Sequence, residues 1–98
     1  MSRNIPTEND CIEVSAVLKN LAHPRRLMIL CQLSDGPKTV SELENLSGAS
    51  QSAVSQFLAR MKAEGLVESK RENQFIYYDI KDSRIKKLIQ SLDRIFCA

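Results

Sequence analysis

The sequence predicts a mainly α-helical domain that carries one small β-hairpin, and three observations support this fold class. Residues 39–64 hold two short helical patterns separated by a Gly-Ala turn at 48–49. Two extended segments joined by a tight turn follow, at 66–72 and 75–80. An apolar helical pattern lies at each end of the chain. A helix-turn-helix followed by a hairpin is a winged helix-turn-helix, an arrangement that usually binds double-stranded DNA.

The first two elements are read from polarity and helical spacing. Residues 1–8 are polar and are expected to form a flexible N-terminal arm, ahead of a single domain over residues 9–98. From 9 to 21, apolar residues recur at helical spacing, with Val14, Val17, Leu18 and Leu21 on one stripe. The next helix is expected to begin with Pro24, because the missing N–H of proline does no harm at a first helical position. It ends before the breaker Asp-Gly-Pro at 35–37.

The helix-turn-helix pattern has clear boundaries. Thr39 and Glu42 fit a capping box, in which each side chain accepts a hydrogen bond from a backbone N–H that the helix leaves free. Gly48 suits a left-handed helix end, and Ser50 can cap the helix that follows. Each helix has an apolar stripe for the core. The stripes are Val40, Leu43 and Leu46 on the first helix, and Ala53, Val54, Phe57, Leu58 and Met61 on the second.

The hairpin and the last helix complete the fold. In the second extended segment, Ile76, Tyr78 and Ile80 alternate on one face. Asp82 can cap a final helix with a long apolar stripe. A domain of this size covers its own core with difficulty. We therefore expect the first and last helices to meet those of a second copy in a homodimer.

Composition limits the class of protein. The 98 residues are 43% hydrophobic and 27% charged, which is typical of one globular domain. No apolar run approaches the roughly 20 residues that span a bilayer, and the polar start lacks a signal peptide, so a cytoplasmic protein without a membrane partner is expected. The net charge of +2 alone would not suggest nucleic acid. A single histidine and three glycines offer no catalytic set and no phosphate loop, so neither an enzyme nor a cofactor is expected.

Five motifs occur in order along the chain: LAHPRRLMIL at 21–30, VSEL at 40–43, QSAVSQFL at 51–58, EGLV at 64–67 and FIYY at 75–78. As an ordered set they resemble the ArsR/SmtB family of bacterial winged-helix repressors, over residues 14–97. The resemblance implies a homodimer built on the first and last helices. It also implies operator DNA that is released when an inducer binds or reacts.

Within that family the sequence is most similar to the thiol-based subset, which responds to reactive sulfur species or oxidants. This resemblance assigns the sensing role to Cys31 and Cys97, while Cys11 has no counterpart. In such chemistry one thiolate attacks a polysulfide, disulfide or peroxide, and a second cysteine resolves the product. Taken alone, Cys31 could equally be a small buried apolar residue, and Cys97 a bystander at the end of a helix.

Candidate DNA contacts fall into three groups. The first turns of a recognition helix face base edges, to which Gln and Ser can hydrogen-bond. Basic and polar residues elsewhere can bind phosphate or enter a minor groove. The candidates are Ser50, Gln51, Ser52, Ser55 and Gln56 for bases, Lys38, Ser41 and Arg60 for phosphates, and Lys70, Arg71, Asn73 and Gln74 in the wing. The plainer alternative is a solvated helix face and a hairpin whose charges only aid solubility.

Two other functions stay open at this point. A metal- or metalloid-responsive repressor of the same family would need at least three convergent nitrogen or sulfur ligands. Residues 41–46 contain no cysteine, residues 82–97 contain no histidine, and the place of His23 before a proline suits a helix start. We therefore expect no metal site. The alternative of another class is a winged helix that binds protein through its polar helix face.

Overall fold

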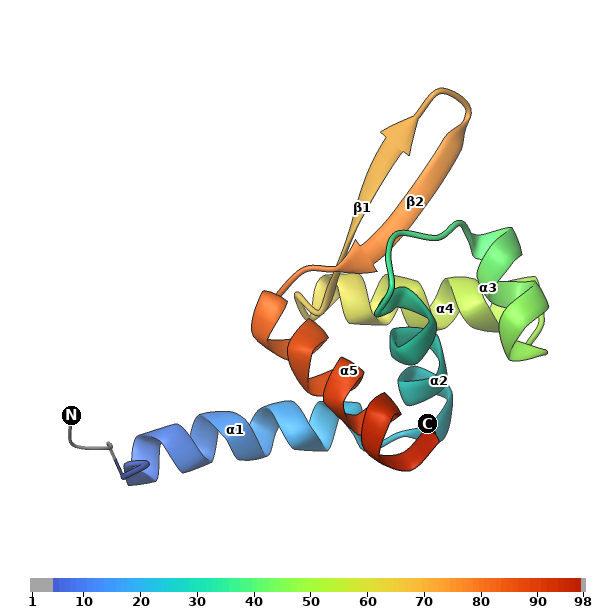
Figure 1. The fold of residues 1–98 in the computed structure, drawn as a ribbon. Helices are drawn as coiled ribbons and strands as arrows, with labels where there is room; N and C mark the ends of the chain where they lie inside the picture. Colours follow the sequence, from blue (N-terminus) through green and yellow to red (C-terminus); the bar gives the residue numbers. More distant parts are fainter. Residues whose placement is uncertain (1–4, 98) are drawn as a thin grey trace.

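The computed structural model describes residues 5–97 of the chain. These residues form α1 (Glu8–Leu21), α2 (Pro24–Leu33), α3 (Val40–Ser47), α4 (Gln51–Ala63), β1 (Val67–Glu72), β2 (Phe75–Ile80) and α5 (Ser83–Cys97), in that order. Helices α2, α3 and α5 surround the middle of the molecule, α4 crosses behind them, and the hairpin projects as a wing (Figure 1). The predicted winged helix-turn-helix is confirmed, and β1 begins one residue later than expected.

The core lies between α2, α3, α4, α5 and the base of the hairpin. Side chains with no exposed surface come from four helices: Leu30, Leu33, Leu43, Val54, Leu58, Met61 and Ile89. Full burial of one such side chain stabilises the fold by about 1.5–3 kcal/mol relative to leaving it in water. The stripe predicted for α4 therefore packs against the apolar side of α2 and Leu43 of α3 to hold the motif together.

Local capping sets the helix boundaries. Thr39 and Glu42 form the predicted capping box, with Thr39 Oγ1 accepting from the Glu42 N–H at 3.2 Å. Gly48 leaves α3 at φ 71°, in the left-handed region that glycine adopts without strain. Asp82 Oδ1 accepts from the Arg84 N–H at 2.8 Å and so caps α5. Hydrogen bonds from the Arg84 side chain and backbone lower the pKa of Asp82 to about 2.

The N-terminal arm is shorter than the sequence suggested. Thr7 caps α1, because its hydroxyl accepts from the Asp10 N–H at 3.1 Å and its own N–H donates to Asp10 at 2.9 Å. Hydrogen bonds from the Thr7 backbone and side chain lower the pKa of the Asp10 carboxyl. The helix thus begins at Glu8, inside the arm expected at 1–8. Residues 1–4 of that arm lie outside the described residues.

The hairpin is antiparallel, from Val67 opposite Ile80 to Glu72 opposite Phe75, with a two-residue turn in which Asn73 has φ 57°. Its base is fixed by two main-chain bonds between Lys38 and Tyr78, at 3.0 and 2.8 Å. Ile80 is buried and Tyr78 is partly buried, but Ile76 is exposed. The predicted apolar face therefore packs only at the base, because the tip extends beyond the body.

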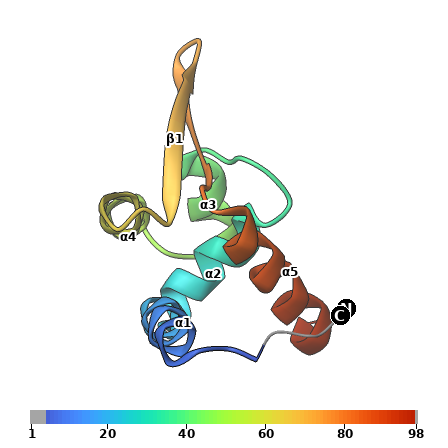
Figure 2. The same cartoon turned by 90° about the vertical axis from the view of Figure 1, so that its left-hand side faces the viewer.

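Three residues of the predicted stripes are largely exposed in the single chain. Helix α1 projects away from the body and meets it at its C-terminal end (Figures 1 and 2), where Leu21 is buried. Val14 and Leu18, nearer its free end, are therefore about half exposed. Leu46, in the last turn of α3, is 57% exposed, so that stripe is buried at Leu43 and only partly at Val40. Among residues 5–97, no helix is long and apolar enough to cross a membrane.

Candidate DNA interface and thiol groove

Helix α4 separates its apolar and polar sides cleanly. Val54, Leu58 and Met61 are buried in the core. The opposite side is exposed over its first two turns and consists of Gln51, Ser52, Ser55 and Gln56, with Arg60 one turn further on. Ser50 precedes them and its hydroxyl accepts from the Ala53 N–H at 3.2 Å, so it caps the helix. The helix therefore presents amide and hydroxyl groups to solvent at its N-terminal end, the end that enters a major groove.

The two phosphate candidates beside α3 differ in availability. Ser41 is exposed on the first turn of α3. The Lys38 side chain is only 17% exposed, and its ammonium group pairs with Asp35. That ion pair lowers the pKa of the Asp35 carboxyl. Lys38 would have to leave Asp35 to bind a phosphate, so its main role in the structure is to anchor the hairpin.

The wing carries its polar candidates near the tip. Lys70, Arg71, Asn73 and Gln74 are all exposed. Arg71 Nε lies 3.5 Å from the Asn73 carbonyl oxygen, and Lys70 Nζ lies 3.9 Å from Glu72. Both contacts are solvent-exposed and weak, so the two cations are free to meet another anion.

Two features of this region were not foreseen in the sequence. Lys62 Nζ donates to Ser69 Oγ at 2.6 Å, which ties the end of α4 to β1. Phe75 at the wing tip is half exposed and packs edge-on with Tyr77, with ring centroids 6.5 Å apart. An aromatic residue directly after the turn is the signal that could have indicated an apolar tip.

Figure 2 shows α3, α4 and the wing in the upper part of the molecule, away from α1 and the end of α5.

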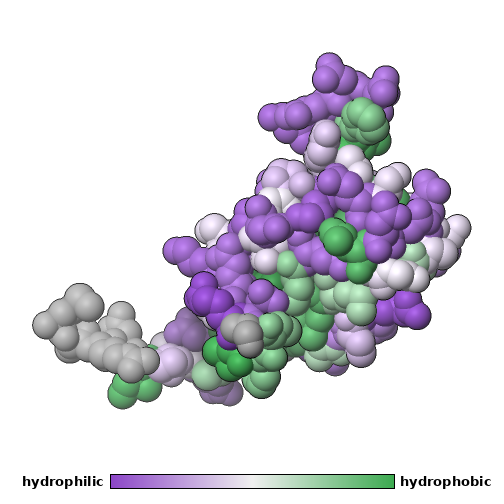
Figure 3. All heavy atoms as spheres, turned by 45° about the vertical axis from the view of Figure 1, so that its right-hand side comes forward, coloured by the Kyte–Doolittle hydropathy of each residue, from purple (hydrophilic) through white to green (hydrophobic). Residues whose placement is uncertain are grey.

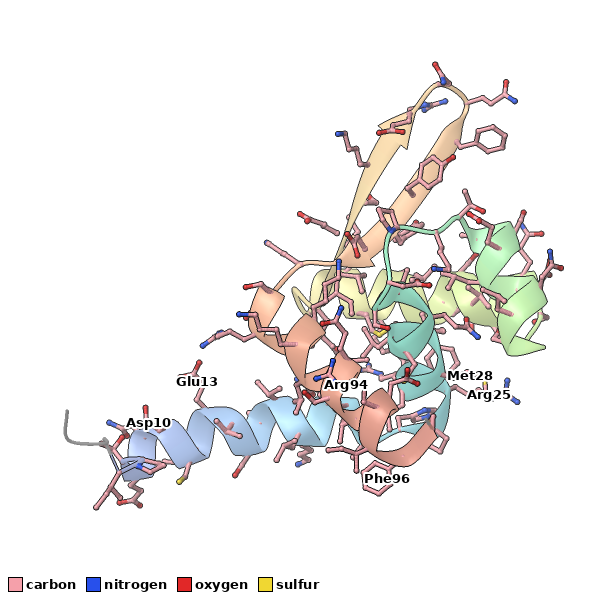
Figure 4. The ribbon with its side chains drawn as sticks, viewed as in Figure 1. Asp10, Glu13, Arg25, Met28, Arg94 and Phe96 are labelled. Carbon is pink, nitrogen blue, oxygen red and sulfur yellow. The ribbon has the colours of Figure 1, made fainter. Side chains whose placement is uncertain are left out.

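The two predicted sensing cysteines lie on one groove. This groove has a volume of about 560 Å³ and runs between α2 and α5, with both Cys31 and Cys97 in its lining. Both thiols are free. The other lining residues are Pro24, Leu27, Met28 and Gln32 from α2 and Leu92, Asp93 and Phe96 from α5. Figure 4 shows Phe96 at the lower edge of the molecule, on α5, and Met28 higher up and to the right, on α2.

The cysteines have different surroundings. Burial, followed by the charges of Asp93 and Cys97, raises the pKa of the Cys31 thiol. Cys97 is exposed at the end of α5. Asp93 was missed in the sequence, although it precedes Cys97 by one helical turn and so lies on the same side of α5. Cys11 is exposed on α1, outside this groove.

One buried arginine connects three elements. Arg26, 8% exposed, donates to both Glu64 oxygens, at 2.6 and 3.1 Å, and to the Asn20 carbonyl at 3.2 Å. The bonds to Arg26 lower the pKa of the Glu64 carboxyl. The sequence signal was its position on the apolar side of α2, three and four residues before Ile29 and Leu30. Helix α2, which carries Cys31, is thereby joined to the C-terminal end of α4.

Metal-binding groups are sparse. Within the part of the chain that the structure describes, no three His, Cys, Asp or Glu side chains are grouped so that they could hold a metal ion. His23, at the start of α2, packs its ring against Phe57 with centroids 5.2 Å apart. The position of His23 directly before α2 and its packing against Phe57 agree with the helix-start role expected from the sequence.

An exposed polar recognition helix, a preceding helix at a fixed turn and a projecting wing with exposed Lys70 and Arg71 define a winged-helix DNA-binding protein. Comparison with known proteins gives the family. The model of the bacterial regulatory protein, arsR family, matches residues 23–69. The HTH-type transcriptional regulator YgaV of Escherichia coli is 45% identical over 86 residues, 87% of each chain. The chain therefore belongs to the ArsR family and is a DNA-binding transcriptional regulator, not an enzyme.

Solved structures of relatives share the fold. Reduced HlyU from Vibrio cholerae superposes with a TM-score of 0.84 at 37% identity, covering 93% of this chain and 96% of that one. The transcriptional repressor BigR from Xylella fastidiosa gives 0.82 at 38% identity, covering 93% of each chain. The fold is thus common to regulators over nearly the full length of this chain.

Proposed function

We propose that the protein is a homodimeric, cytoplasmic repressor whose operator binding is switched by reactive sulfur species or oxidants at Cys31 and Cys97. The observation that carries this proposal is the shared groove, which brings together two cysteines from opposite parts of the chain. Two neighbouring thiols are what a reversible switch requires, one to attack the oxidant and one to resolve the adduct.

A bridge between the cysteines would act on the arrangement of the dimer. It would join α2 to the end of α5, the helix that we assign to dimerisation. The two recognition helices must match half-sites about 34 Å apart, so a change in their spacing weakens operator binding. Typical coupling energies of 1–3 kcal/mol would lower affinity by about 5–150-fold.

Relatives support the thiol switch and bear on the sign of regulation. One HlyU structure is described as reduced, which indicates that a redox state was distinguished in that relative. BigR is described as a repressor, whereas the V. cholerae HlyU is named a transcriptional activator. Repression is our proposal for this chain because direct occupation of an operator blocks transcription without any further contact.

For the interface itself, we assign base contacts to Ser50, Gln51, Ser52, Ser55 and Gln56, and phosphate or minor-groove contacts to Ser41, Arg60, Lys70, Arg71, Asn73 and Gln74. The exposure of these side chains supports the assignment. Lys38 stays in the proposal with a smaller role, since Asp35 already pairs with its charge.

The decisive experiment measures operator binding by fluorescence anisotropy, with intact mass recorded on every sample. Reduced protein should bind with strong salt dependence, and polysulfide or peroxide should release it together with a mass change confined to Cys31 and Cys97. Cys11→Ser should respond like the wild type, which makes it the matched control. A normal response in the Cys31→Ser and Cys97→Ser proteins would contradict the thiol switch.

The same assay separates the alternatives. Release by Zn²⁺ or arsenite at unchanged covalent mass would point to a metal- or metalloid-responsive repressor. Absence of any salt-dependent DNA binding by the reduced protein would favour a winged helix that binds protein.

A further inference from the structure

The groove that holds Cys31 and Cys97 is larger and more apolar than two thiols require. Its volume of about 560 Å³ falls within the range of small-molecule sites, roughly 300–1,000 Å³. Its walls are made by Pro24, Leu27, Met28, Leu92 and Phe96. Figure 3 shows hydrophobic residues gathered on the lower part of the face drawn, beneath largely hydrophilic upper parts.

The polar groups of the groove disfavour anions. Among the described residues that line it, Asp93 is the one with a charged side chain, and its charge is negative. The other polar side chain, Gln32, has its Oε1 buried without a hydrogen-bond partner among the described residues. A carboxylate that entered would therefore meet the like charge of Asp93. An uncharged ligand with alkyl groups would meet apolar walls.

We propose that this groove selects uncharged, apolar polysulfanes, such as dialkyl trisulfides, as the oxidants that reach Cys97 and Cys31, in preference to hydrophilic anionic polysulfanes. The inference rests on the proposed function, because it names the class of inducer for that same thiol pair.

The reaction with a dialkyl trisulfide proceeds in two balanced steps. The Cys97 thiolate attacks an outer sulfur, forms a Cys97–S–S–R disulfide, and the broken S–S bond releases RSS⁻. Cys31 then loses its proton to solvent and attacks the Cys97 sulfur. This forms the Cys31–Cys97 disulfide and releases RS⁻. Two thiols lose two electrons in total, and the trisulfide is reduced to one thiol and one hydropersulfide.

The test compares dipropyl trisulfide with glutathione trisulfide, which carries four carboxylates, on the reduced full-length protein near neutral pH. Rates at each cysteine are followed by quenched peptide mass spectrometry. Cys11 is the internal reference, because it is exposed on α1 beside Asp10 but outside the groove. The preference for dipropyl trisulfide should be about tenfold greater at Cys97 than at Cys11, the effect of burying about two methylene groups.

Variants locate the selectivity. Met28→Ser should slow the reaction with dipropyl trisulfide and leave the reaction with glutathione trisulfide unchanged. Leu46→Ser removes a similarly exposed apolar side chain from α3 and should change neither rate. Asp93→Asn should speed the glutathione reaction by severalfold, and Glu68→Gln in the wing should leave both rates unchanged. Thermal melts of each variant confirm that the fold is retained.

The inference would be overturned if Cys97 and Cys11 showed the same ratio of the rate with dipropyl trisulfide to the rate with glutathione trisulfide. It would also be overturned if neither Met28→Ser nor Asp93→Asn changed this ratio at Cys97. Operator binding is measured separately on the same samples. If Cys97 prefers dipropyl trisulfide as expected but the modified protein binds operator normally, the selectivity of the groove holds and the proposed switch fails.

Discussion

At the scale of single residues, the two cysteines are expected to react in a fixed order. Burial and the nearby Asp93 raise the pKa of Cys31, so near neutral pH a smaller fraction of it is thiolate than for an ordinary cysteine. Cys97 is exposed and should attack first. The Cys31→Ser protein should then accumulate an adduct on Cys97, while Cys97→Ser should react slowly.

The pH dependence checks this order. Because the pKa of Cys31 is raised, its reaction rate in the Cys97→Ser protein should go on rising at a pH where an ordinary thiol has levelled off. Stopped reactions analysed by intact mass over a pH series give both rates. Faster modification of Cys31 than of Cys97 near neutral pH would reverse the proposed roles.

Single side chains should also separate base reading from phosphate binding. Arg71→Ala should weaken binding to all sequences and reduce the salt slope by roughly one unit per lost phosphate contact. Gln51→Ala or Gln56→Ala should instead relax the preference at particular operator positions, by about 1–3 kcal/mol if a bidentate contact is lost. Titrations at several salt concentrations on matched and mismatched operators measure both effects. An Arg71→Ala protein with unchanged affinity and slope would remove that residue from the interface.

At the scale of elements, the Arg26–Glu64 pair should hold α2 and α4 in register. Glu64→Gln should lower the free energy of unfolding by about 1–3 kcal/mol, because it leaves a buried guanidinium short of its charged partner. The exposed pair of Arg84 with Asp82 is the control, and Arg84→Gln should lower the free energy of unfolding by less than Glu64→Gln does. Urea melts measure both. Similar losses from Glu64→Gln and Arg84→Gln would show that the Arg26–Glu64 pair has no special role in stability.

The pair also has a predictable pH dependence. The pKa of Glu64 is lowered in the folded state, so its contribution is complete above the unfolded value near 4.5 and is lost as the pH falls through the folded value. The stability difference between wild type and Glu64→Gln should therefore shrink as the pH falls below about 4.5. A difference that stays constant down to acid pH would mean that the ion pair does not contribute.

The sequence could predict features that depend on residues close together in the chain, but not features that depend on how distant elements pack. The capping box at Thr39, the left-handed Gly48 and the start at Pro24 depend on neighbours within four residues, so these boundaries were predicted correctly. Burial depends on what another element covers, and Leu46 was therefore placed too deeply. Local spacing in the sequence does not show which distant side chains come close in the fold. Cys31 and Cys97 were paired only through a family resemblance.

Other long-range contacts had no such guide. Nothing near Arg26 in the sequence points to Glu64, and nothing near Lys62 points to Ser69, because each contact depends on how separate elements pack. The candidate DNA residues could be chosen because a recognition helix is itself a local pattern. Lys38 shows the limit of that reasoning, since its partner Asp35 and its bonds to Tyr78 appear only in the structure.

At the scale of the whole molecule, the terminal helices leave apolar surface uncovered. Ile12 is 61% exposed on the projecting α1, Val14 and Leu18 are about half exposed, and Ile95 near the end of α5 is 71% exposed. Exposed apolar side chains gathered on two helices favour an interaction site, and a second copy presents the same helices for a closed two-fold contact. Helix α1 and the end of α5 lie away from α3, α4 and the wing, so such pairing leaves the DNA-binding elements free (Figure 2).

Leu18→Glu should therefore convert the dimer to a monomer without unfolding it, because this side chain packs little within its own chain. The monomer should keep its circular dichroism spectrum but lose most of its operator affinity, since one recognition helix can then occupy only one half-site. Leu46→Glu places the same charge on a similarly exposed leucine of α3 and should leave the dimer intact. Sedimentation velocity at micromolar concentration measures the oligomeric state of both variants. A dimeric Leu18→Glu protein would move the interface away from α1.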